Sequence, residues 1–446
     1  MRRRKIAAIA ASLAAVVLLV LFPREFFIIL AYGLTILYLI WGVYHLVIMA
    51  VGLKAPFNPG TNPKSFPKLS LIIPARDEPI LSRTIEICLN HVEYPEDNKE
   101  VVIVTEDPVG ERTAIWYSQL YPGRVIPVIR REYFPTKPSA LNDSILICKG
   151  DIIGIVDVED IPEGDTFLKV ASAIENHGLD SIQAILRISN ENDNWITKIF
   201  AMEYAGWFRI WLNGRSRLGF FTPLGGTGNY VKRSLIAEVG GWDPLNLAED
   251  AEIAIRFHLS RRKTVLIDTR HWEEAPTSFK AWLRQRTRWF RGWIQSLIKY
   301  FKVLFRPAIL RRIGLIEVFS IFLMLSAPIM VLLNWVAYGM TVYWVLEYLD
   351  IIPFTLTANL FPWWALLPLL FNIVYYYTWI QGGVLEKMGT AKALLKYLPH
   401  MIFYMNLMMP LAAIRAFYQE VFKDVFWEKT RHIGRGAKWV IAEKRT

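Results

Sequence analysis

The sequence predicts an α/β domain with a Rossmann-like, mostly parallel sheet, joined to an α-helical transmembrane region. Between Pro67 and about residue 280, short apolar runs alternate with helical stretches, which is typical of parallel sheets with crossover helices. The chain is also 53% hydrophobic, with a mean hydropathy of +0.27. A soluble protein of 446 residues usually has a lower hydropathy, so we expect part of the chain to lie in lipid.

Residues 1–66 predict two N-terminal transmembrane helices and a linker. An apolar run, Ile6–Phe22, follows four basic residues, and a second run, Phe26–Leu53, comes after a tight turn at Pro23. A cleaved signal peptide is the alternative, but the small-residue cleavage site is missing. The basic N-terminus is expected to stay inside, which returns the chain to the inside after the second helix.

Residues 281–312 predict an amphipathic helix at the membrane interface. Aromatic and apolar side chains fall near one face, with cations interspersed, as in helices that lie at lipid headgroups. The alternative is an ordinary amphipathic helix packed on the soluble domain. The proposed apolar face consists of Trp289, Trp293, Leu297, Phe301 and Phe305.

Residues 313–422 predict C-terminal transmembrane and interfacial helices. Ile313–Leu349 is either one long kinked helix or a tight pair, and Trp363–Leu385 is a clearer span. Ala393–Val421 contains prolines and charges, so we expect it to be interfacial or re-entrant. The basic tail, residues 423–446, should lie inside, which requires an even number of crossings after the soluble domain: two, or alternatively four.

The charge and cysteine content narrow the partners. The net charge of +11 falls in short basic clusters without base-stacking motifs, which favours an anionic membrane surface and a nucleoside diphosphate over a nucleic acid. Cys88 and Cys148 have neither zinc nor disulfide spacing. We expect both to be reduced, buried thiols in a cytoplasmic domain.

Acidic side chains follow three of the four predicted strands. Arg76-Asp77-Glu78, Glu106-Asp107 and Asp157-Val158-Glu159-Asp160 each come directly after an apolar run. Parallel sheets bind ligands outside the carboxyl ends of their strands, so three clusters at one edge indicate a site. Crowded carboxylates are costly without a cation, which points to a divalent metal carrying a nucleoside diphosphate. The predicted strands are Leu69–Ala75, Val101–Thr105, Val125–Ile129 and Asp151–Val156.

Eight motifs, taken in order, resemble family 2 glycosyltransferases with a GT-A fold, specifically their cellulose-synthase-like membrane branch. The resemblance covers nearly the whole chain. The motifs are Leu71–Glu78, Val101–Asp107, Pro135–Asn142, Asp157–Asp160, Leu224–Asn229, Ala248–Asp250, Gln285–Trp289 and Trp427–His432. In two motifs the sequence departs from the family pattern: Glu159 stands where Asp is usual, and Ala248 where Thr is usual.

The resemblance implies the donor-binding residues. Asp157 and Glu159 would hold Mg²⁺ or Mn²⁺, and Glu can still bind such a hard cation. Glu106 and Asp107 are competing candidates for the acid that contacts the base or ribose, with Glu106 favoured because it comes first after the strand. The implied nucleotide-binding residues are Pro74, Ala75, Arg76, Glu78, Glu106, Lys137, Asn142 and Asp157.

The resemblance also implies the catalytic and acceptor residues. Asp250 is the expected base that deprotonates an acceptor hydroxyl in an inverting displacement, with Glu249 orienting the acceptor. The residues expected at the acceptor and diphosphate are Thr227, Gln285, Arg288 and Trp289, and Trp427–His432 is expected to close over the donor. Each has a structural alternative: the acids can favour a helix start, Trp289 can be a core or interface anchor, and the glycines can permit a turn.

The sequence therefore predicts an inverting, metal-dependent hexosyltransferase on a multi-pass protein of the cell membrane, with its catalytic domain in the cytoplasm. GDP-mannose and UDP-glucose are both plausible donors, and a lipid-linked glycan is the favoured acceptor. The alternatives are a processive polysaccharide synthase, a glycolipid synthase, a membrane transporter with a nucleotide-sensing domain, and an inactive nucleotide-sugar binder. A transporter would carry ionisable residues inside its spans, and the clearer spans have few.

Overall fold

The computed structural model describes residues 21–131, 134–352, 363–424 and 426. Its centre is an eight-stranded sheet of order β3-β2-β1-β4-β7-β6-β8-β5. The pairs β1–β2, β2–β3, β1–β4 and β6–β8 are parallel, whereas β7 runs antiparallel between β4 and β6, and β5 pairs antiparallel with β8. The strands are β1 (Leu69–Ala75), β2 (Lys99–Thr105), β3 (Val125–Ile129), β4 (Ile152–Ile155), β5 (Ile161–Pro162), β6 (Ser181–Ile188), β7 (Asn229–Lys232) and β8 (Thr264–Glu273).

The mostly parallel sheet confirms the predicted fold class, and all four predicted strands are present. β1 and β3 have the predicted bounds, β2 begins two residues earlier, at Lys99, and β4 is one residue shorter at each end. These strands are apolar along their length because both faces of the sheet are covered. In β1, Leu71 packs into one core and its neighbour Ile72 into the other.

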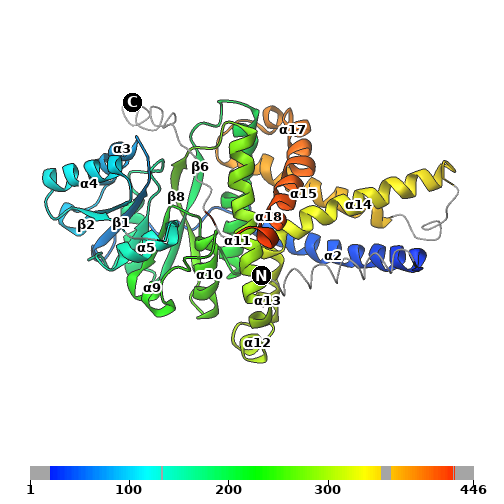
Figure 1. The fold of residues 1–446 in the computed structure, drawn as a ribbon, viewed down its shortest axis with the longest axis horizontal. Helices are drawn as coiled ribbons and strands as arrows, with labels where there is room; N and C mark the ends of the chain where they lie inside the picture. The colour runs from blue at the N-terminus through cyan, green and yellow to red at the C-terminus, as the bar shows by residue number, and fades with distance from the viewer. Residues whose placement is uncertain (1–20, 132–133, 353–362, 425, 427–446) are drawn as a thin grey trace.

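Helices cover both faces of the sheet, which places the site at its edge (Figure 1). One face carries α3 (Leu81–Glu86), α4 (Pro108–Leu120) and α6 (Thr166–Glu175). The other carries α5 (Lys137–Ile145), α9 (Arg233–Val239) and α10 (Glu249–Leu259), with parts of α11 (Phe279–Leu304) and α13 (Leu315–Leu325). Further short elements are η1 (Ile87–His91), η2 (Glu96–Asn98) and α12 (Pro307–Ile313).

Long apolar helices extend away from the sheet domain. α2 (Pro23–Gly52) and α14 (Ala327–Tyr348) project together, and α11 runs across their direction (Figure 1). Side chains of α2 pack against α13 and α14 in a separate apolar cluster, and Tyr38 on α2 donates a hydrogen bond to Asn334 on α14. The remaining helices are α7 (Trp195–Tyr204), η3 (Ala205–Leu212), α8 (Asn213–Leu218), α15 (Trp363–Leu385), α16 (Ala391–Leu395), α17 (Leu398–Phe403), η4 (Tyr404–Met408) and α18 (Met409–Phe422).

Within the described residues, three helices are long and apolar enough to cross a membrane: Arg24–Gly52, Ala327–Tyr348 and Leu398–Phe422. Most of the first predicted span, residues 6–20, lies outside the described residues, and so does the predicted closing loop Trp427–His432. Ile313–Leu349 forms two helices, α13 and α14, that meet at Ser326. The break fits the proline two residues later, which has no N–H to continue the first helix.

Two predicted interfacial segments are more deeply packed than expected. Leu398–Phe422 is a helix of 25 residues rather than a re-entrant segment, and α18 buries Ala412 and Ala416 in the core shared with α11. In α11 itself, Trp282 and Phe290 are buried, whereas Phe301 and Phe305 near its end are exposed. The first part of α11 therefore matches the alternative of a helix packed on the domain, and only its end presents an apolar surface.

Both cysteines are free and buried, as the sequence predicts.

Candidate active site

A cavity of about 260 Å³ opens at the carboxyl ends of β1, β2 and β4. Its polar half is formed by side chains that follow these strands and begin α5 and α10, together with Arg288 of α11. Its aromatic half is formed by rings from α7, η3 and α11. The polar half consists of Arg76, Glu78, Glu106, Arg130, Lys137, Asp157, Glu159, Glu249, Asp250 and Arg288; the aromatic half consists of Tyr204, Trp207, Phe208, Trp289 and Trp293.

The ends of β1 and β2 form one wall of the polar half. Pro74 and Ala75 close β1, and Glu106 follows β2. Arg130 lies 3.6 Å from Glu106 and 2.7 Å from Asp143, so it fixes the Glu106 carboxylate at the wall. Arg76 and Glu78 line the same wall.

The structure separates the two acids that competed for the base or ribose contact. Asp107 is the N-cap of α4, where its carboxylate accepts hydrogen bonds from the amides of Val109 and Gly110, and it also accepts one from the amide of Asp77. These bonds hold the pKa of Asp107 below its ordinary value, although burial alone would raise it. Glu106 faces the cavity, which favours Glu106 as the candidate.

Lys137 connects the acidic motif to the Gly-rich segment. Its Nζ lies 2.5 Å from Asp157 Oδ1, donates to the carbonyl of Gly226 at 2.8 Å, and lies 3.9 Å from Glu249 Oε1. Burial would lower the pKa of Lys137, but Asp157 and Glu249 raise it above its ordinary value. The ammonium therefore stays charged and offers fixed positive charge within the cavity.

Asp157 and Asp250 face the same point although 93 positions separate them in the chain. A Cβ atom on Gly226 would lie 3.9 Å from Asp157 Oδ2, 3.7 Å from Asp250 Oδ2 and 3.6 Å from Lys137 Nζ. Glycine leaves that point open. The arrangement gives a substrate atom room between one carboxylate on the β4 side and another at the start of α10.

Burial raises the pKa of the acids at the start of α10. The pKa of Glu249 rises to about 7, through burial and the neighbouring Asp250. The pKa of Asp250 is also raised, chiefly by burial, while Lys137 and Arg288 act in the opposite direction. A carboxylate with a raised pKa is a better proton acceptor near neutral pH.

α11 brings three predicted residues to the cavity: Gln285, Arg288 and Trp289 all line it. The Trp289 ring lies near Tyr204, with the ring centroids 6.2 Å apart, and the guanidinium of Arg286 lies 4.7 Å from the Trp289 ring centroid. Arg286 in turn forms a two-bonded ion pair with Glu203. Trp289 is thus held from behind and presents a flat apolar face to the cavity.

Asp157 and Glu159 fit a magnesium or manganese ion that takes its remaining ligands from a bound diphosphate. Such ions often use one or two carboxylates together with substrate phosphates. Among the residues the structure describes, no group of three or more Asp, Glu, His or Cys side chains converges as a metal cage. Burial and the adjacent Asp157 raise the pKa of Glu159 to about 8, so the two acids repel each other until a cation arrives.

Two predicted site residues do not line the cavity. Asn142 lies on α5 and exchanges hydrogen bonds with the backbone of Trp242, at 2.8 Å each way, which fixes the turn before α10 instead of meeting a ligand. Thr227 is fully buried and accepts a hydrogen bond from the amide of Asp157 at 3.0 Å, so it lies beneath the acidic motif. The spacing of these motifs is right, but their amide and hydroxyl groups bind backbone and buried partners.

The structure adds Glu273 and Tyr204 to the cavity wall, neither of which was among the predicted site residues. Glu273 closes β8, and burial together with Asp160, Glu159 and Asp157 raises its pKa well above the ordinary value. A polar residue at a strand end is the signal that marked Glu106 and Asp157, and it could have marked Glu273. Tyr204 ends α7 within an apolar helical stretch and carries no such signal.

The model of the family described as "Glycosyltransferase like family 2" matches residues 67–292, half of the chain. The chain belongs to the family 2 glycosyltransferases. The matched region runs from the start of β1 into α11, so it holds the whole sheet and every predicted site residue from Pro74 to Trp289.

Curated relatives of this family 2 glycosyltransferase cover the same region. The probable glycosyltransferase YdaM of Bacillus subtilis is 27% identical over 260 residues, 55% of this chain and 60% of YdaM. A beta-monoglucosyldiacylglycerol synthase of Synechocystis sp. is 29% identical over 244 residues, 53% of this chain and 50% of the relative. The match therefore spans only 50–60% of the length of these relatives.

A solved structure matches the fold over most of the chain. The mannosyltransferase PcManGT of Pyrobaculum calidifontis, in complex with GDP-Man and Mn²⁺, superposes with a TM-score of 0.54 over 88% of this chain and 98% of that one. The sequence identity is 16%, so the likeness concerns the fold, a GT-A-like sheet with its helices.

Proposed function

We propose that this chain is an inverting, metal-dependent hexosyltransferase that uses a nucleoside-diphosphate hexose, with GDP-mannose and UDP-glucose as candidate donors. The observation that carries this proposal is the meeting of Asp157, Lys137 and Asp250 around Gly226. A sugar transfer needs positive charge at the departing diphosphate and a base at the incoming hydroxyl. The cavity offers the two on opposite sides of one open point.

The side chains have distinct roles in this proposal. Asp250 accepts the proton of the acceptor hydroxyl as its oxygen attacks the anomeric carbon from the face opposite the diphosphate. Lys137 and Arg288 stabilise the negative charge that develops on the departing diphosphate. A divalent cation held by Asp157 and Glu159 would neutralise further charge on the same phosphate oxygens.

The aromatic half of the cavity is proposed to bind the acceptor. Trp289 presents a ring face on which a sugar ring or a lipid headgroup can lie. Trp207 and Trp293 line this cavity and also a smaller one of about 30 Å³ among α2, α13, α14 and α15. The acceptor side of the site thus adjoins helices that are long and apolar enough to span a membrane, which supports a lipid acceptor.

We propose a lipid-linked glycan as the acceptor, with a glycolipid-synthase function as the second candidate. The relatives support the second candidate, because beta-monoglucosyldiacylglycerol synthases are among them. Both candidates require membrane association with the catalytic domain on the cytoplasmic side, which the buried free thiols also support.

A basic and aromatic elbow between α11 and α13 supports this placement. Phe301, Phe305 and Ile316 are 49%, 39% and 68% exposed. Four exposed cations lie between them, at Lys302, Arg306, Arg311 and Arg312, and Lys302 to Ile316 contains no acidic residue. Apolar side chains in the bilayer with cations at anionic headgroups is the pattern of interfacial helices.

A donor and acceptor screen tests the function. Full-length protein in detergent or nanodiscs is incubated with Mn²⁺, a panel of labelled nucleoside-diphosphate hexoses, and either polyprenyl-linked oligosaccharide or diacylglycerol. We expect label to enter the lipid fraction with one donor, and the product identifies the acceptor class. Neither transfer nor donor hydrolysis with any nucleotide sugar would contradict the proposal.

A further inference from the structure

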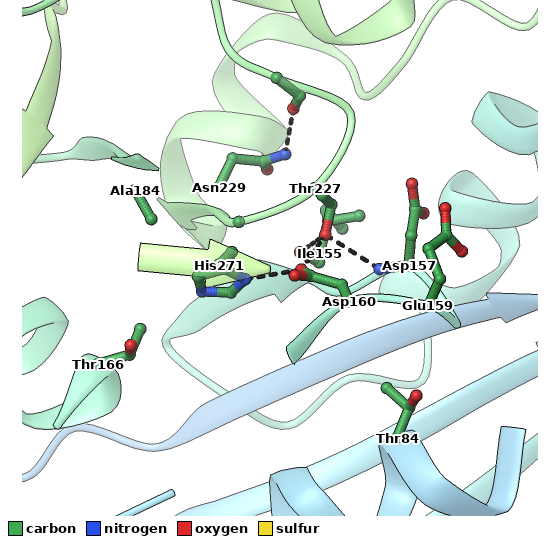
Figure 2. A network of polar contacts seen from close by, with 12 residues as sticks. Thr84, Ile155, Asp157, Glu159, Asp160, Thr166, Ala184, Thr227, Asn229 and His271 are labelled. Carbon is green, nitrogen blue, oxygen red and sulfur yellow. Dashed lines mark hydrogen bonds and ion pairs between the residues drawn. The ribbon is translucent and has the colours of Figure 1, made fainter. Parts of the chain in front are cut away.

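The turn that carries Asp157 and Glu159 is anchored from below by a buried network of side chains (Figure 2). The turn begins after β4, and Asp160 ends it directly before β5. In the sheet, β7, β6 and β8 lie between β4 and β5, so the turn crosses the edge of three strands. Asp157 and Glu159 line the cavity, whereas Asp160 is fully buried.

Asp160 binds a histidine on β8. Its Oδ2 atom lies 2.6 Å from Nδ1 of His271 and accepts a hydrogen bond from the hydroxyl of Thr227. Its other oxygen, Oδ1, has no hydrogen-bond partner among the described residues. His271 and Thr227 therefore hold the Asp160 side chain through a single oxygen.

Thr227 connects this carboxylate to the candidate metal ligands. Its hydroxyl oxygen accepts a hydrogen bond from the amide of Asp157 at 3.0 Å, while its proton goes to Asp160. One hydroxyl thus fixes the backbone at both ends of the four-residue turn. Asp160, Thr227 and His271 are all 0% exposed, so water does not compete for these bonds.

A tyrosine fixes the orientation of the imidazole. The hydroxyl of Tyr230 lies 3.0 Å from Nε2 of His271, and Tyr230 is also fully buried. With Tyr230 on one nitrogen and a carboxylate on the other, the ring carries its proton on Nδ1, toward Asp160.

The Gly-rich segment makes room for this histidine. Gly228 has a φ of +61°, and a Cβ atom there would lie 3.0 Å from Cγ of His271 and 2.8 Å from a methyl group of Leu186. Glycine is therefore required at 228 both for its left-handed backbone and for the close approach of the imidazole. This gives Gly228 a packing role distinct from contact with a sugar.

We propose that His271 is a positioning residue: through Asp160 and Thr227 it holds the Asp157–Glu159 backbone so that both carboxylates point at one cation. This inference rests on the proposed function and adds residues that the motifs do not contain. Partners that orient metal ligands typically contribute 10–100-fold to metal affinity, so losing the network should be visible in binding as well as in turnover.

Metal binding by full-length protein tests the proposal, with Mn²⁺ as the probe in the presence of GDP or UDP. Free Mn²⁺ is measured by electron paramagnetic resonance, and each variant is melted to confirm that it folds. We expect Thr227→Val and His271→Leu to weaken Mn²⁺ binding about 10-fold or more, with metal-free nucleotide binding unchanged. Thr227→Ser keeps the hydroxyl, and His271→Asn keeps a donor near the position of Nδ1, so both should recover most of the affinity.

The controls separate positioning from stability. Tyr230→Phe removes the contact at Nε2 but leaves the bond to Asp160, so it should lower the melting temperature with little effect on Mn²⁺ affinity. Folded Thr227→Val or His271→Leu protein with wild-type Mn²⁺ affinity would overturn the positioning role. Wild-type protein that binds Mn²⁺ with neither nucleotide would instead overturn the metal dependence of the proposed function, and the positioning role with it.

Discussion

The polar half of the cavity is built from strand ends, whereas its aromatic half is built from helices. In the polar half, Lys137, Asp157 and Glu249 are held within 4 Å of one another's charged atoms by ion pairs. In the aromatic half, Trp207, Trp289 and Trp293 lie on η3 and α11 and adjoin the apolar helices. The difference separates two tasks: fixed charge for a phosphorylated donor, and apolar surface for an acceptor from the membrane.

The largest expected effect comes from Asp250 in the polar half. Asp250→Asn keeps the shape of the side chain but removes the base, so we expect turnover to fall about 10²–10⁴-fold. Donor binding should change little. Transfer of labelled sugar measures turnover, and calorimetry measures nucleotide binding.

Asp243→Asn is the matched control for this change. Asp243 lies seven residues earlier, does not line the cavity, and pairs with Lys299 at 2.8 Å. Its substitution should leave turnover near that of the wild type. Unchanged turnover in Asp250→Asn would show that another group takes the proton.

The next effect comes from the fixed charge of Lys137. Lys137→Met removes the ammonium beside Asp157, so the departing diphosphate loses a positive partner, and kcat should fall about 100-fold. Lys169→Met is the control, since Lys169 forms a similar ion pair with Asp165 at 2.9 Å but does not line the cavity. Equal kinetics for the two variants would remove Lys137 from the reaction.

The contrast between the halves also explains what the sequence could predict. Strand periodicity and polar residues at strand ends gave the walls at Arg76, Glu106 and Asp157, because parallel strands deliver their carboxyl ends to one edge. His271 sits inside β8, and its partner Asp160 comes from a turn that crosses three strands, so no local pattern connects them.

The misplaced residues have a similar cause. Asn142 and Thr227 occupy family motifs, but the sequence does not say whether a polar group faces a ligand or a backbone amide. Among the helices, Leu398–Phe422 contains prolines that suggested a break. In the structure, Pro399 and Pro410 fall in the first turns of α17 and α18, where a missing N–H costs least, and the long helix continues.

The aromatic half is expected to act on the acceptor alone. Trp289→Ala should raise KM for the lipid acceptor about 10-fold, because base or sugar stacking on an aromatic ring contributes on the order of 1–3 kcal/mol. Donor hydrolysis in the absence of acceptor should be unchanged, and Trp289→Phe should lie between the two. Trp116→Ala on the exposed face of α4 is the control, since Trp116 is 55% exposed and does not line the cavity. An equal loss of donor hydrolysis would end the division of the cavity into donor and acceptor halves.

The smallest effect is a pH dependence of stability that belongs to the polar half. The native pKa values of Glu159 and Glu249 are raised to about 8 and about 7. Unfolded carboxyl groups titrate near pH 4.3, so between these values the native state binds more protons than the unfolded state. Its stability must therefore fall as the pH rises through the native pKa values.

Melting temperatures of metal-free protein at constant ionic strength, from about pH 5.5 to about pH 8, should decrease by a few degrees. Glu249→Gln should reduce this slope because it removes one of the two groups, and Trp289→Ala should leave it unchanged. Mn²⁺ with nucleotide binds the ionised carboxylates, so it should stabilise the protein most at high pH and flatten the slope. A melting temperature that rises toward pH 8 without metal would mean that these acids are already ionised in the empty cavity, and that Lys137 alone balances their charge.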